Sequence, residues 1–367
     1  MIVRISPKYS FDSQYWWYSV RTNSLVGLIP TFYLTRLGRF QTGDVNQRFG
    51  CYATALDTDD WIDFDTPVIG VADIELTPTS ALPSGTLYFS HYPMYPYSRT
   101  TRKMTEWLAN ANVSDTTSST NGIIGTATER ASTLDDKTIP ALNFYGFKIT
   151  NASSTNTKNK AILASGNHAG ENPGRFTIEG VIDFLLGGST EANNLLDWFE
   201  FYVYPCLDPQ GIYGGYYRST PQDPTKNHNR EWIAETTLES VIAFKTAMIA
   251  DTGGTVNLGI DFHSFGSTEN SGYNMSYITD DTTDIAVAFE SALKATEGSE
   301  FNLIVPDPAV GSLWNLFDTS FSPQLSLSLE TGGRLSYSVA GYKSYGQNVM
   351  LAINTILNAG LFTNAPA

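Results

Sequence analysis

The stretch Lys160 to Arg175, KAILASGNHAGENPGR, decides how this sequence is interpreted. Its apolar run, Ala161 to Ser165, is followed by a turn of small residues that carries His168 and Glu171. A short apolar run bounded by turn residues predicts a buried strand. Because the imidazole and the carboxylate are three positions apart, a turn at the end of the strand can direct both toward one metal ion. The alternative is a capped turn that leads only into a helix over Phe176 to Leu186.

The composition predicts a folded protein with a large core and about two domains. The 367 residues are 41% hydrophobic and 13% aromatic, which is enough to bury a sizeable interior. The net charge of −15 makes most of the surface repel nucleic acid and anionic lipid, so neither is expected as a partner. The first residues lack the apolar run of a signal peptide and no stretch is long enough to span a membrane, so we expect a cytoplasmic protein. Cys51 and Cys206 are far apart and predict neither a disulfide nor a cysteine zinc site.

The hydrophobic pattern changes near residue 98. Before it, apolar runs broken by turn residues predict a compact antiparallel β domain over residues 1–98, in which His91 is expected to be structural. A helix over Arg99 to Ala109 then opens a second domain, residues 99–367. Residues 110–138, rich in Ser, Thr, Asn and Asp, predict a long surface loop or a partly disordered insertion.

After residue 138 apolar strands alternate with amphipathic helices, which predicts an α/β fold whose mixed, largely parallel sheet has helices on both faces. The expected strands are Asn143 to Thr150, Ala161 to Ser165, Glu200 to Cys206, Val256 to His263, Phe301 to Val305 and Leu325 to Glu330. The expected helices are Phe176 to Leu186, Glu231 to Ala250, Thr283 to Glu297 and Lys343 to Ala359.

Three residues with metal-site chemistry lie at or just past the ends of predicted strands: His168, His263 and Glu330. Ligands bind beyond the carboxyl ends of strands in such sheets. Together with Glu171, the two histidines make the two-His, one-carboxylate set of a catalytic zinc with an open position. Glu330 follows the alternating run LSLSL and is a candidate general base, although a strand-end acid facing solvent is the alternative.

A loop of 26 residues, Leu207 to Trp232, is long enough to be functional. Its Arg218 and Arg230 are suited to carboxylate or oxyanion recognition, and Asn229 adds an amide donor. The alternative is two surface arginines beside a helix cap. His228 competes with His168 and His263 as a zinc ligand, but it is flanked by the recognition residues.

The order HAGE, DPQG with GGYYRS, NHNREW, DFHS and a strand ending in Glu resembles the zinc metallocarboxypeptidase family, carboxypeptidase A-like, and within it the cytosolic carboxypeptidase-like branch. That branch also has an N-terminal β-sandwich joined through an aromatic-Pro-Tyr segment, which YFSHYPMYPYSRTTRKMTEWL resembles. The resemblance covers nearly the whole chain. It implies a zinc carboxypeptidase fold preceded by a small antiparallel β-sandwich.

The resemblance also implies a role for each matched residue. One Zn²⁺ per chain would be held by His168, Glu171 and His263, with Glu330 as the general base and acid that works on a metal-activated water. Arg218 would stabilise the oxyanion. Asn229 and Arg230 would bind the terminal carboxylate of the peptide or protein substrate. The chain is thus expected to be an exopeptidase acting on C-termini.

Three departures from the family pattern stand out. The position two residues before the recognition Asn, commonly Asp, is Asn227, which brings no negative charge to the histidine it would orient. Gly170 stands where pancreatic-type members have Arg, as in the cytosolic branch. No Tyr occurs between Tyr277 and Glu330, so Trp314 or a Tyr from residues 213–217 would have to replace the family's substrate-binding Tyr.

Two other functions share parts of this pattern. A zinc amidohydrolase acting on N-acyl amino acids would have the same metal ligands, and a catalytically weak peptide-binding relative would have the same scaffold. The residue removed is also open. Because residues 301–329 contain no Lys or Arg, we expect a pocket that does not select C-terminal Glu, unless Arg175 or Arg334 lies inside it.

Overall fold

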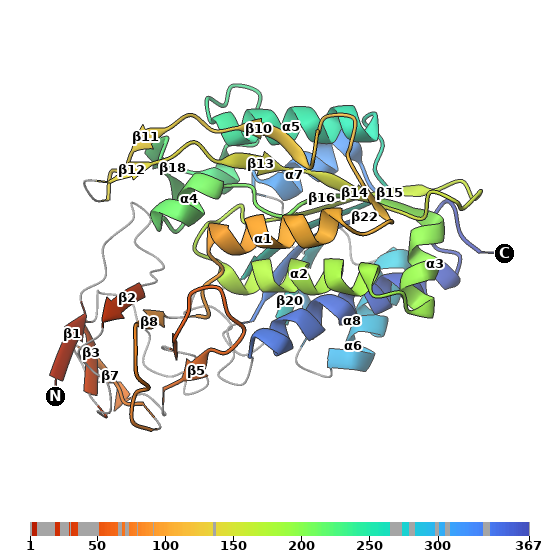
Figure 1. Cartoon of the computed structure of the whole chain (residues 1–367). Helices are drawn as coiled ribbons and strands as arrows, with labels where there is room; N and C mark the ends of the chain where they lie inside the picture. The colour runs from red at the N-terminus through yellow and green to blue at the C-terminus, as the bar shows by residue number, and fades with distance from the viewer. Residues whose placement is uncertain are drawn as a thin grey trace.

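The computed structural model describes residues 2–5, 19–22, 29, 31–35, 51–64, 68–69, 73–78, 80–90, 92–134, 137–264, 274–278, 283–297, 301–304, 309–332 and 338–366. A large α/β body with a smaller β region beside it makes up this part of the chain (Figure 1). His91 and Arg334 lie outside the described residues.

The α/β body is built on an eight-stranded mixed sheet in the order β21-β20-β22-β19-β15-β16-β14-β9. Neighbours from β22 to β16 pair in parallel, as do β20 and β21, and the remaining three pairings are antiparallel. The predicted mixed α/β sheet is therefore confirmed. The strands are β9 (Val113–Ser114), β14 (Phe147–Ile149), β15 (Asn159–Ser165), β16 (Phe199–Tyr204), β19 (Leu258–Ser264), β20 (Asn274–Ile278), β21 (Phe301–Ile304) and β22 (Leu325–Thr331).

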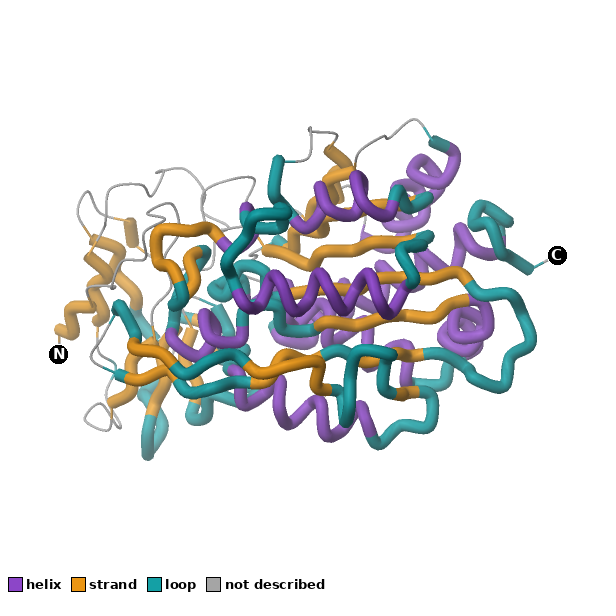
Figure 2. Tube along the Cα trace, turned by 90° about the horizontal axis from the view of Figure 1, so that it is seen from above, coloured by secondary structure: helices purple, strands orange, loops and turns teal. Residues whose placement is uncertain are grey.

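Helices cover both faces of this sheet because alternate side chains of each buried strand point to opposite sides (Figure 2). Leu163, Ile260 and Leu327 pack in the cluster that contains α2 (Asn172–Leu186), α6 (Asp284–Glu297) and α8 (Val339–Asn358). On the other face, Ile162 and Ala164 pack with α5 (Glu239–Thr252), α7 (Leu313–Leu316) and the π-helical turn η3 (Phe317–Phe321). Helices α1 (Tyr97–Leu108) and α3 (Thr190–Trp198) join the first cluster.

Several elements differ from the sequence predictions. The helix expected over 231–250 begins only at Glu239, and the chain before it forms α4 (Pro209–Gly214) and a short 3-10 turn, η1 (His228–Arg230). The strand expected over 143–150 is broken at Gly146 into β13 (Asn143–Tyr145) and β14, which belong to different sheets. The predicted loop 110–138 contains β9, β10 (Ile123–Thr126), β11 (Arg130–Ala131) and the first residue of β12 (Thr138–Ile139). These short strands form because β9 pairs with β14, β10 with β13 and β11 with β12.

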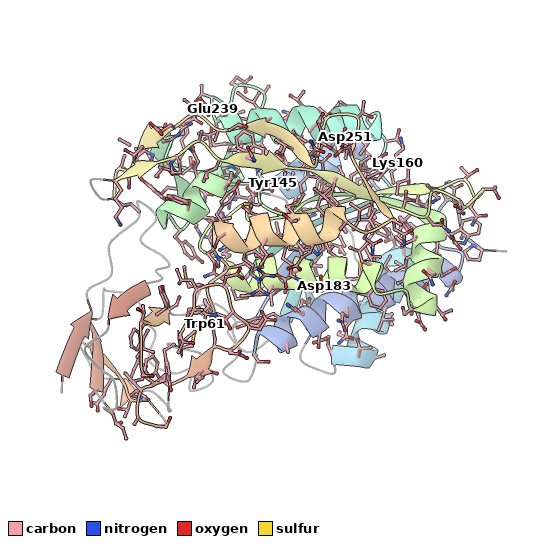
Figure 3. All side chains as sticks on the ribbon, in the orientation of Figure 1. Trp61, Tyr145, Lys160, Asp183, Glu239 and Asp251 are labelled. Carbon is pink, nitrogen blue, oxygen red and sulfur yellow. The ribbon has the colours of Figure 1, made fainter. Side chains whose placement is uncertain are left out.

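The N-terminal region contains two four-stranded sheets, in the orders β1-β3-β7-β6 and β2-β8-β4-β5. Their pairings are antiparallel as predicted, except that β1 and β3 run parallel. The strands are β1 (Ile2–Ile5), β2 (Ser19–Thr22), β3 (Thr31–Thr35), β4 (Cys51–Ala53), β5 (Ile62–Asp63), β6 (Val68–Ile69), β7 (Asp73–Leu76) and β8 (Leu87–Ser90). Figure 3 locates Trp61 in this region and Asp183 on α2 of the α/β body.

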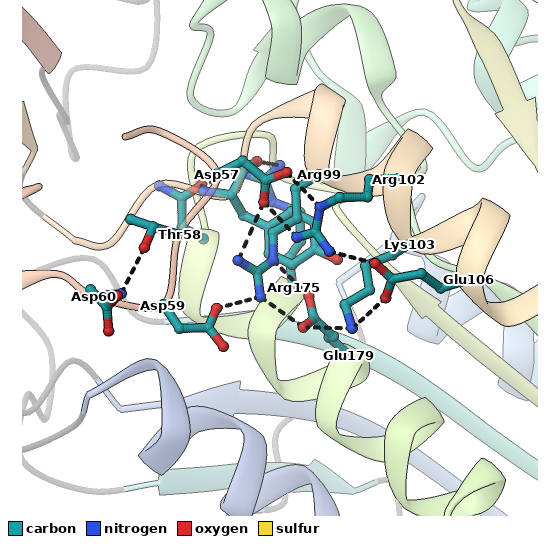
Figure 4. A network of polar contacts seen from close by, with 12 residues as sticks. Asp57, Thr58, Asp59, Asp60, Arg99, Arg102, Lys103, Glu106, Arg175 and Glu179 are labelled. Carbon is teal, nitrogen blue, oxygen red and sulfur yellow. Dashed lines mark hydrogen bonds and ion pairs between the residues drawn. The ribbon is translucent and has the colours of Figure 1, made fainter. Parts of the chain in front are cut away.

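An ion cluster centred on the buried side chains of Arg99 and Glu179 connects the two regions (Figure 4). Arg99 of α1 donates to both carboxylate oxygens of Glu179 on α2, at 2.8 and 2.7 Å, and to Asp59 at 2.6 Å. Nζ of Lys343 on α8 lies 2.6 Å from Oε1 of Glu179 and 3.0 Å from Oδ2 of Asp59. Three elements of the α/β body therefore hold the loop that carries Asp59. Within the described residues, no helix is long and apolar enough to cross a membrane.

Candidate active site

Three buried side chains meet at the C-terminal ends of β15 and β19. Nδ1 of His168 lies 2.8 Å from one carboxylate oxygen of Glu171, and Nδ1 of His263 lies 2.7 Å from the other. One possible ligand atom from each residue lies within 4.8 Å of the others. The structure thus brings together the three residues predicted from the sequence as metal ligands.

The local chain explains how the turn presents these groups. Gly166, with φ of 77°, reverses the chain directly after β15 in a conformation that favours glycine. Helix α2 begins at Asn172, four residues earlier than predicted, with proline at its start. A side chain at Gly174 would place its Cβ 2.7 Å from the carbonyl oxygen of His263. Glycine here therefore lets the first turn of α2 approach the strand that carries the second histidine.

Each histidine has a different polar partner on its second ring nitrogen. Nε2 of His168 lies 3.0 Å from Oδ1 of Asn227, the position where the family pattern has Asp. Nε2 of His263 lies 2.8 Å from Oδ2 of Asp261, which the sequence reasoning did not identify. An Nε2–H bond to these oxygens leaves the Nδ1 lone pair available to a metal. The negative charge missing beside His168 is thus present beside His263.

The electrostatics keep the carboxylate of the cluster ionised. Burial raises the pKa of Glu171, but the two neighbouring histidines lower it more, and the result is well below the ordinary value. The backbone N–H of Ser264 also donates to Oε2 of Glu171, at 3.0 Å. Two imidazole nitrogens and one carboxylate form a donor set that fits zinc, and each of the three groups is oriented by a further hydrogen-bonding partner.

Glu330 lies beside this cluster on the neighbouring strand. It is paired in register with His263 across β19 and β22, and its side chain is half-buried. Burial raises the pKa of the Glu330 carboxyl, His263 lowers it, and the negative charge of Glu171 raises it again. The resulting pKa is about 8. A cation bound by the three ligands would lower this pKa again, because it stabilises the charged carboxylate. The position is suited to proton transfer at the metal site.

Arg218 and Asn229 also reach the cluster. Nη2 of Arg218 lies 3.5 Å from Oε1 of Glu171, and its guanidinium lies over the ring of Tyr217. Nδ2 of Asn229 lies 3.2 Å from Nε2 of His263. Arg230 is exposed, and its Nη1 donates to the carbonyl of Asn229 at 2.7 Å. This contact links Arg230 to the cluster through its neighbour.

The rival ligand His228 is turned away from the cluster. Its Nδ1 lies 2.7 Å from Oδ1 of Asn167 and its Nε2 lies 2.9 Å from Oγ of Ser240. Burial, with a smaller contribution from the neighbouring His168, lowers its pKa to about 3. Both ring nitrogens have protein partners, so His228 is a neutral structural residue.

Arg175, which could have supplied a positive charge to the pocket for the terminal side chain, contacts other parts of the protein instead. Arg175 is buried on α2, and its guanidinium donates to the carbonyl oxygens of Tyr95 and Ala169 and to the side chain of Asn172. These contacts hold the junction with the residues before α1. Arg175 is therefore engaged in structure, and the expectation that it could serve an acidic substrate side chain is not supported by its contacts.

Two residues of the site escaped the sequence reasoning, Asp261 and Asn167. Asp261 carried a usable signal, because residues two apart in a strand face the same side and Asp261 is two before His263. Asn167 is fully buried, and the sequence showed it only as a turn residue.

Comparison with known proteins agrees with this geometry. Residues 136–235 match the family model for zinc carboxypeptidase. Over 120 residues the chain is 31% identical to mouse cytosolic carboxypeptidase 6, covering 31% of this chain and 22% of that protein. Over 78 residues it is 38% identical to human cytosolic carboxypeptidase 2, covering 20% of this chain and 9% of that protein. The matched segments are therefore a small part of these longer relatives.

Solved structures with the same fold cover much more of the chain. A metallo-carboxypeptidase from Burkholderia cenocepacia has a TM-score of 0.73 at 16% identity, covering 97% of this chain and 93% of that one. A structure named putative carboxypeptidase A, from Shewanella denitrificans, has a TM-score of 0.74 at 18% identity with the same coverage. Part of this chain therefore resembles zinc carboxypeptidases in sequence, and the chain shares the fold of these solved metallo-carboxypeptidases.

Proposed function

We propose that the chain is a zinc-dependent metallocarboxypeptidase that hydrolyses the C-terminal peptide bond of peptides or proteins. One observation carries the proposal: Nδ1 of His168, Nδ1 of His263 and the carboxylate of Glu171 converge at the strand ends, with Glu330 paired to His263 on the next strand. Metal ligands and a neighbouring general base are the two parts that such hydrolysis needs.

His168, Glu171 and His263 would hold one zinc ion per chain. Bound zinc would supply a Lewis acid for the scissile carbonyl and make water more acidic. Glu330 would accept a proton from the attacking water and return it to the nitrogen of the leaving residue as the C–N bond breaks. Arg218, a permanent cation beside Glu171, would stabilise the negative charge that develops on the carbonyl oxygen.

Asn229 and Arg230 would bind the free carboxylate of the substrate. The side-chain amide of Asn229 lies at the edge of the cluster, and the exposed guanidinium of Arg230 follows it in the chain. A carboxylate held there would place the last peptide bond of a substrate near the metal ligands. An N-acyl amino acid has the same carboxylate next to its scissile amide, so the two functions differ in the acyl side of the substrate, which the assay below compares.

Three proteins test the proposal: the wild type, His263→Ala and Glu330→Gln. We expect about one zinc per wild-type chain, with loss of zinc and activity in His263→Ala because three ligands leave no redundancy. Glu330→Gln should retain zinc and the fold while turnover falls by several orders of magnitude. Mass spectrometry of digested peptides and of N-acyl amino acids would distinguish a peptidase from an amidohydrolase. Stoichiometric zinc in His263→Ala would refute the ligand assignment.

A further inference from the structure

Asn167 is a buried residue with four polar contacts behind the proposed active site. Its Nδ2 donates to Oδ1 of Asn229 at 2.7 Å and to Oδ2 of Asp261 at 3.1 Å. Its Oδ1 accepts from Nε1 of Trp232 at 3.1 Å and lies 2.7 Å from Nδ1 of His228. It is fully buried, so all four contacts are made away from water.

The orientation of the Asn167 amide follows from the chemistry of these neighbours. The indole nitrogen of Trp232 can only donate, so it must meet the oxygen of Asn167. The carboxylate of Asp261 can only accept, so it must meet the nitrogen. His228 then donates from Nδ1 and accepts at Nε2 from the hydroxyl of Ser240. Because Trp232 and Asp261 each have a single possible role, they fix the roles of the other groups, and this network has one arrangement.

That arrangement fixes the amide of Asn229 in turn. Its Oδ1 is occupied by Nδ2 of Asn167 and by the backbone N–H of Leu313, at 3.0 Å. Its Nδ2 therefore faces Nε2 of His263. That ring nitrogen lies 2.8 Å from the carboxylate of Asp261 and uses its proton there, so it cannot accept from Asn229. The N–H groups of Asn229, beside His263, thus lack a protein acceptor in the described contacts, which suits them to a carboxylate.

We propose that Asn167 is a positioning residue that connects the binding of the substrate carboxylate with the support of the metal ligand. Through Asn229 it aims the amide that meets the carboxylate, and through Asp261 it holds the group that orients His263. One buried side chain thereby sets the spacing between the terminal carboxylate and the metal. This inference rests on the proposed carboxypeptidase function.

The test is a double-mutant cycle with Asn167→Ala, Asn229→Ala and the double variant. Each zinc-loaded protein is assayed on one peptide with a free C-terminus and on its C-terminal amide, and the time course of zinc loss to a chelator is followed separately. Asn159→Ala is the matched control, because Asn159 is an equally buried asparagine at the start of β15, the strand that ends just before Asn167, and so lies at the end away from the site. If Asn167→Ala does not fold, Asn167→Asp keeps the shape and removes the donor.

We expect Asn167→Ala to raise KM for the free-acid peptide roughly tenfold, as for loss of a well-formed polar interaction, with a smaller change in kcat. When Asn229 is already Ala, Asn167→Ala should leave unchanged the acid-to-amide preference, which is the ratio of kcat/KM for the free-acid peptide to that for its amide, since Asn167 acts through Asn229. Zinc loss should be several-fold faster than in Asn159→Ala.

Equal falls in the acid-to-amide preference in both backgrounds, or no fall in either, would overturn the inference. Zinc loss no faster than in Asn159→Ala would also overturn it. If instead the wild type shows no preference for the free acid, the proposed function itself fails, and the zinc measurement still decides whether Asn167 supports Asp261.

Discussion

Oδ2 of Asp261 lies 2.8 Å from Nε2 of His263, two residues farther along the same strand. The corresponding contact of the other histidine, His168, is made by the neutral Asn227. The two imidazoles of one candidate metal centre therefore have unequal support, one from a carboxylate and one from an amide. A carboxylate partner makes a ligating imidazole more basic and fixes its tautomer.

Replacing Asp261 by Asn should weaken zinc binding while leaving the fold intact. The amide keeps the shape and an acceptor oxygen but removes the charge, so we expect about tenfold lower affinity. The measurement is zinc competition with a chelator of known affinity. Asp251→Asn is the control, because Asp251 is also a buried carboxylate and bonds to Tyr204, away from the site. Equal zinc affinity in both variants would refute the role of Asp261.

Replacing Asn227 by Asp should have the opposite effect. Its Oδ1 accepts from the backbone N–H of Asn229 at 2.9 Å as well as meeting His168, and a carboxylate can make both contacts. The added charge should make the imidazole more basic and slow zinc loss several-fold. The same chelator competition measures it. Faster zinc loss in Asn227→Asp would show that the amide is needed at this position.

The ion cluster around Glu179 should make stability depend on acid pH. Burial raises the pKa of this carboxyl, but Arg99 and Lys343 lower it more, to about 2 from the ordinary 4.5. A lowered pKa in the folded state means that the stabilisation is fully present above about pH 4.5 and is lost as the pH falls toward about 2.

Urea unfolding of the wild type and Glu179→Gln across this pH range measures the effect. Near neutral pH the variant should be less stable by roughly 3 to 5 kcal/mol, because Arg99 loses its buried carboxylate partner and retains only the more exposed Asp57 and Asp59. This difference should shrink as the solution is acidified. Glu106→Gln is the control, since the Arg102–Glu106 pair is exposed and should contribute less than about 1 kcal/mol. A difference that does not vary with pH would contradict the assignment.

The terminal residue removed should not be restricted to Glu. Leu313, Trp314 and Phe317 are buried in α7 and η3, which pack against β19, and the described residues 309–332 include no cation. A carboxylate desolvated there would cost several kcal/mol, whereas an apolar side chain would gain roughly 1.5 to 3 kcal/mol. Release of C-terminal Glu, Phe, Leu and Lys from otherwise identical peptides checks this. A tenfold or greater lead for Glu would refute it.

The residues at the strand ends could be predicted well from the sequence. The residues that hydrogen-bond to the candidate ligands and hold them in place could be predicted only poorly. His168, His263 and Glu330 could be placed because apolar strands are visible in the sequence and parallel strands end at one edge. The contact of Asn227 with His168, inferred from the family pattern, is present in the structure. Asn167 could not be found this way, because its partners come from two distant segments, residues 228–232 and β19, and a turn asparagine has no local signal for them.

The predicted boundaries of helices and strands are wrong where tertiary contacts override the local preference of the sequence. Residues 231–238 have helix-compatible composition, yet the backbone of Trp232 donates to Gly311 and its indole donates to Asn167. Those contacts hold this segment beside the site, and α5 starts only at Glu239. The strand expected over 143–150 breaks at Gly146, where a side chain would place its Cβ 2.9 Å from the ring of Tyr204.

The most direct test of the account compares one peptide as its free acid and as its C-terminal amide, incubated with zinc-loaded and zinc-depleted protein. We predict that the zinc-loaded protein removes single residues from the free acid, that it cleaves the amide at least about tenfold more slowly, and that the zinc-depleted protein does neither. Equal cleavage of acid and amide, or cleavage that survives zinc removal, would contradict a zinc carboxypeptidase.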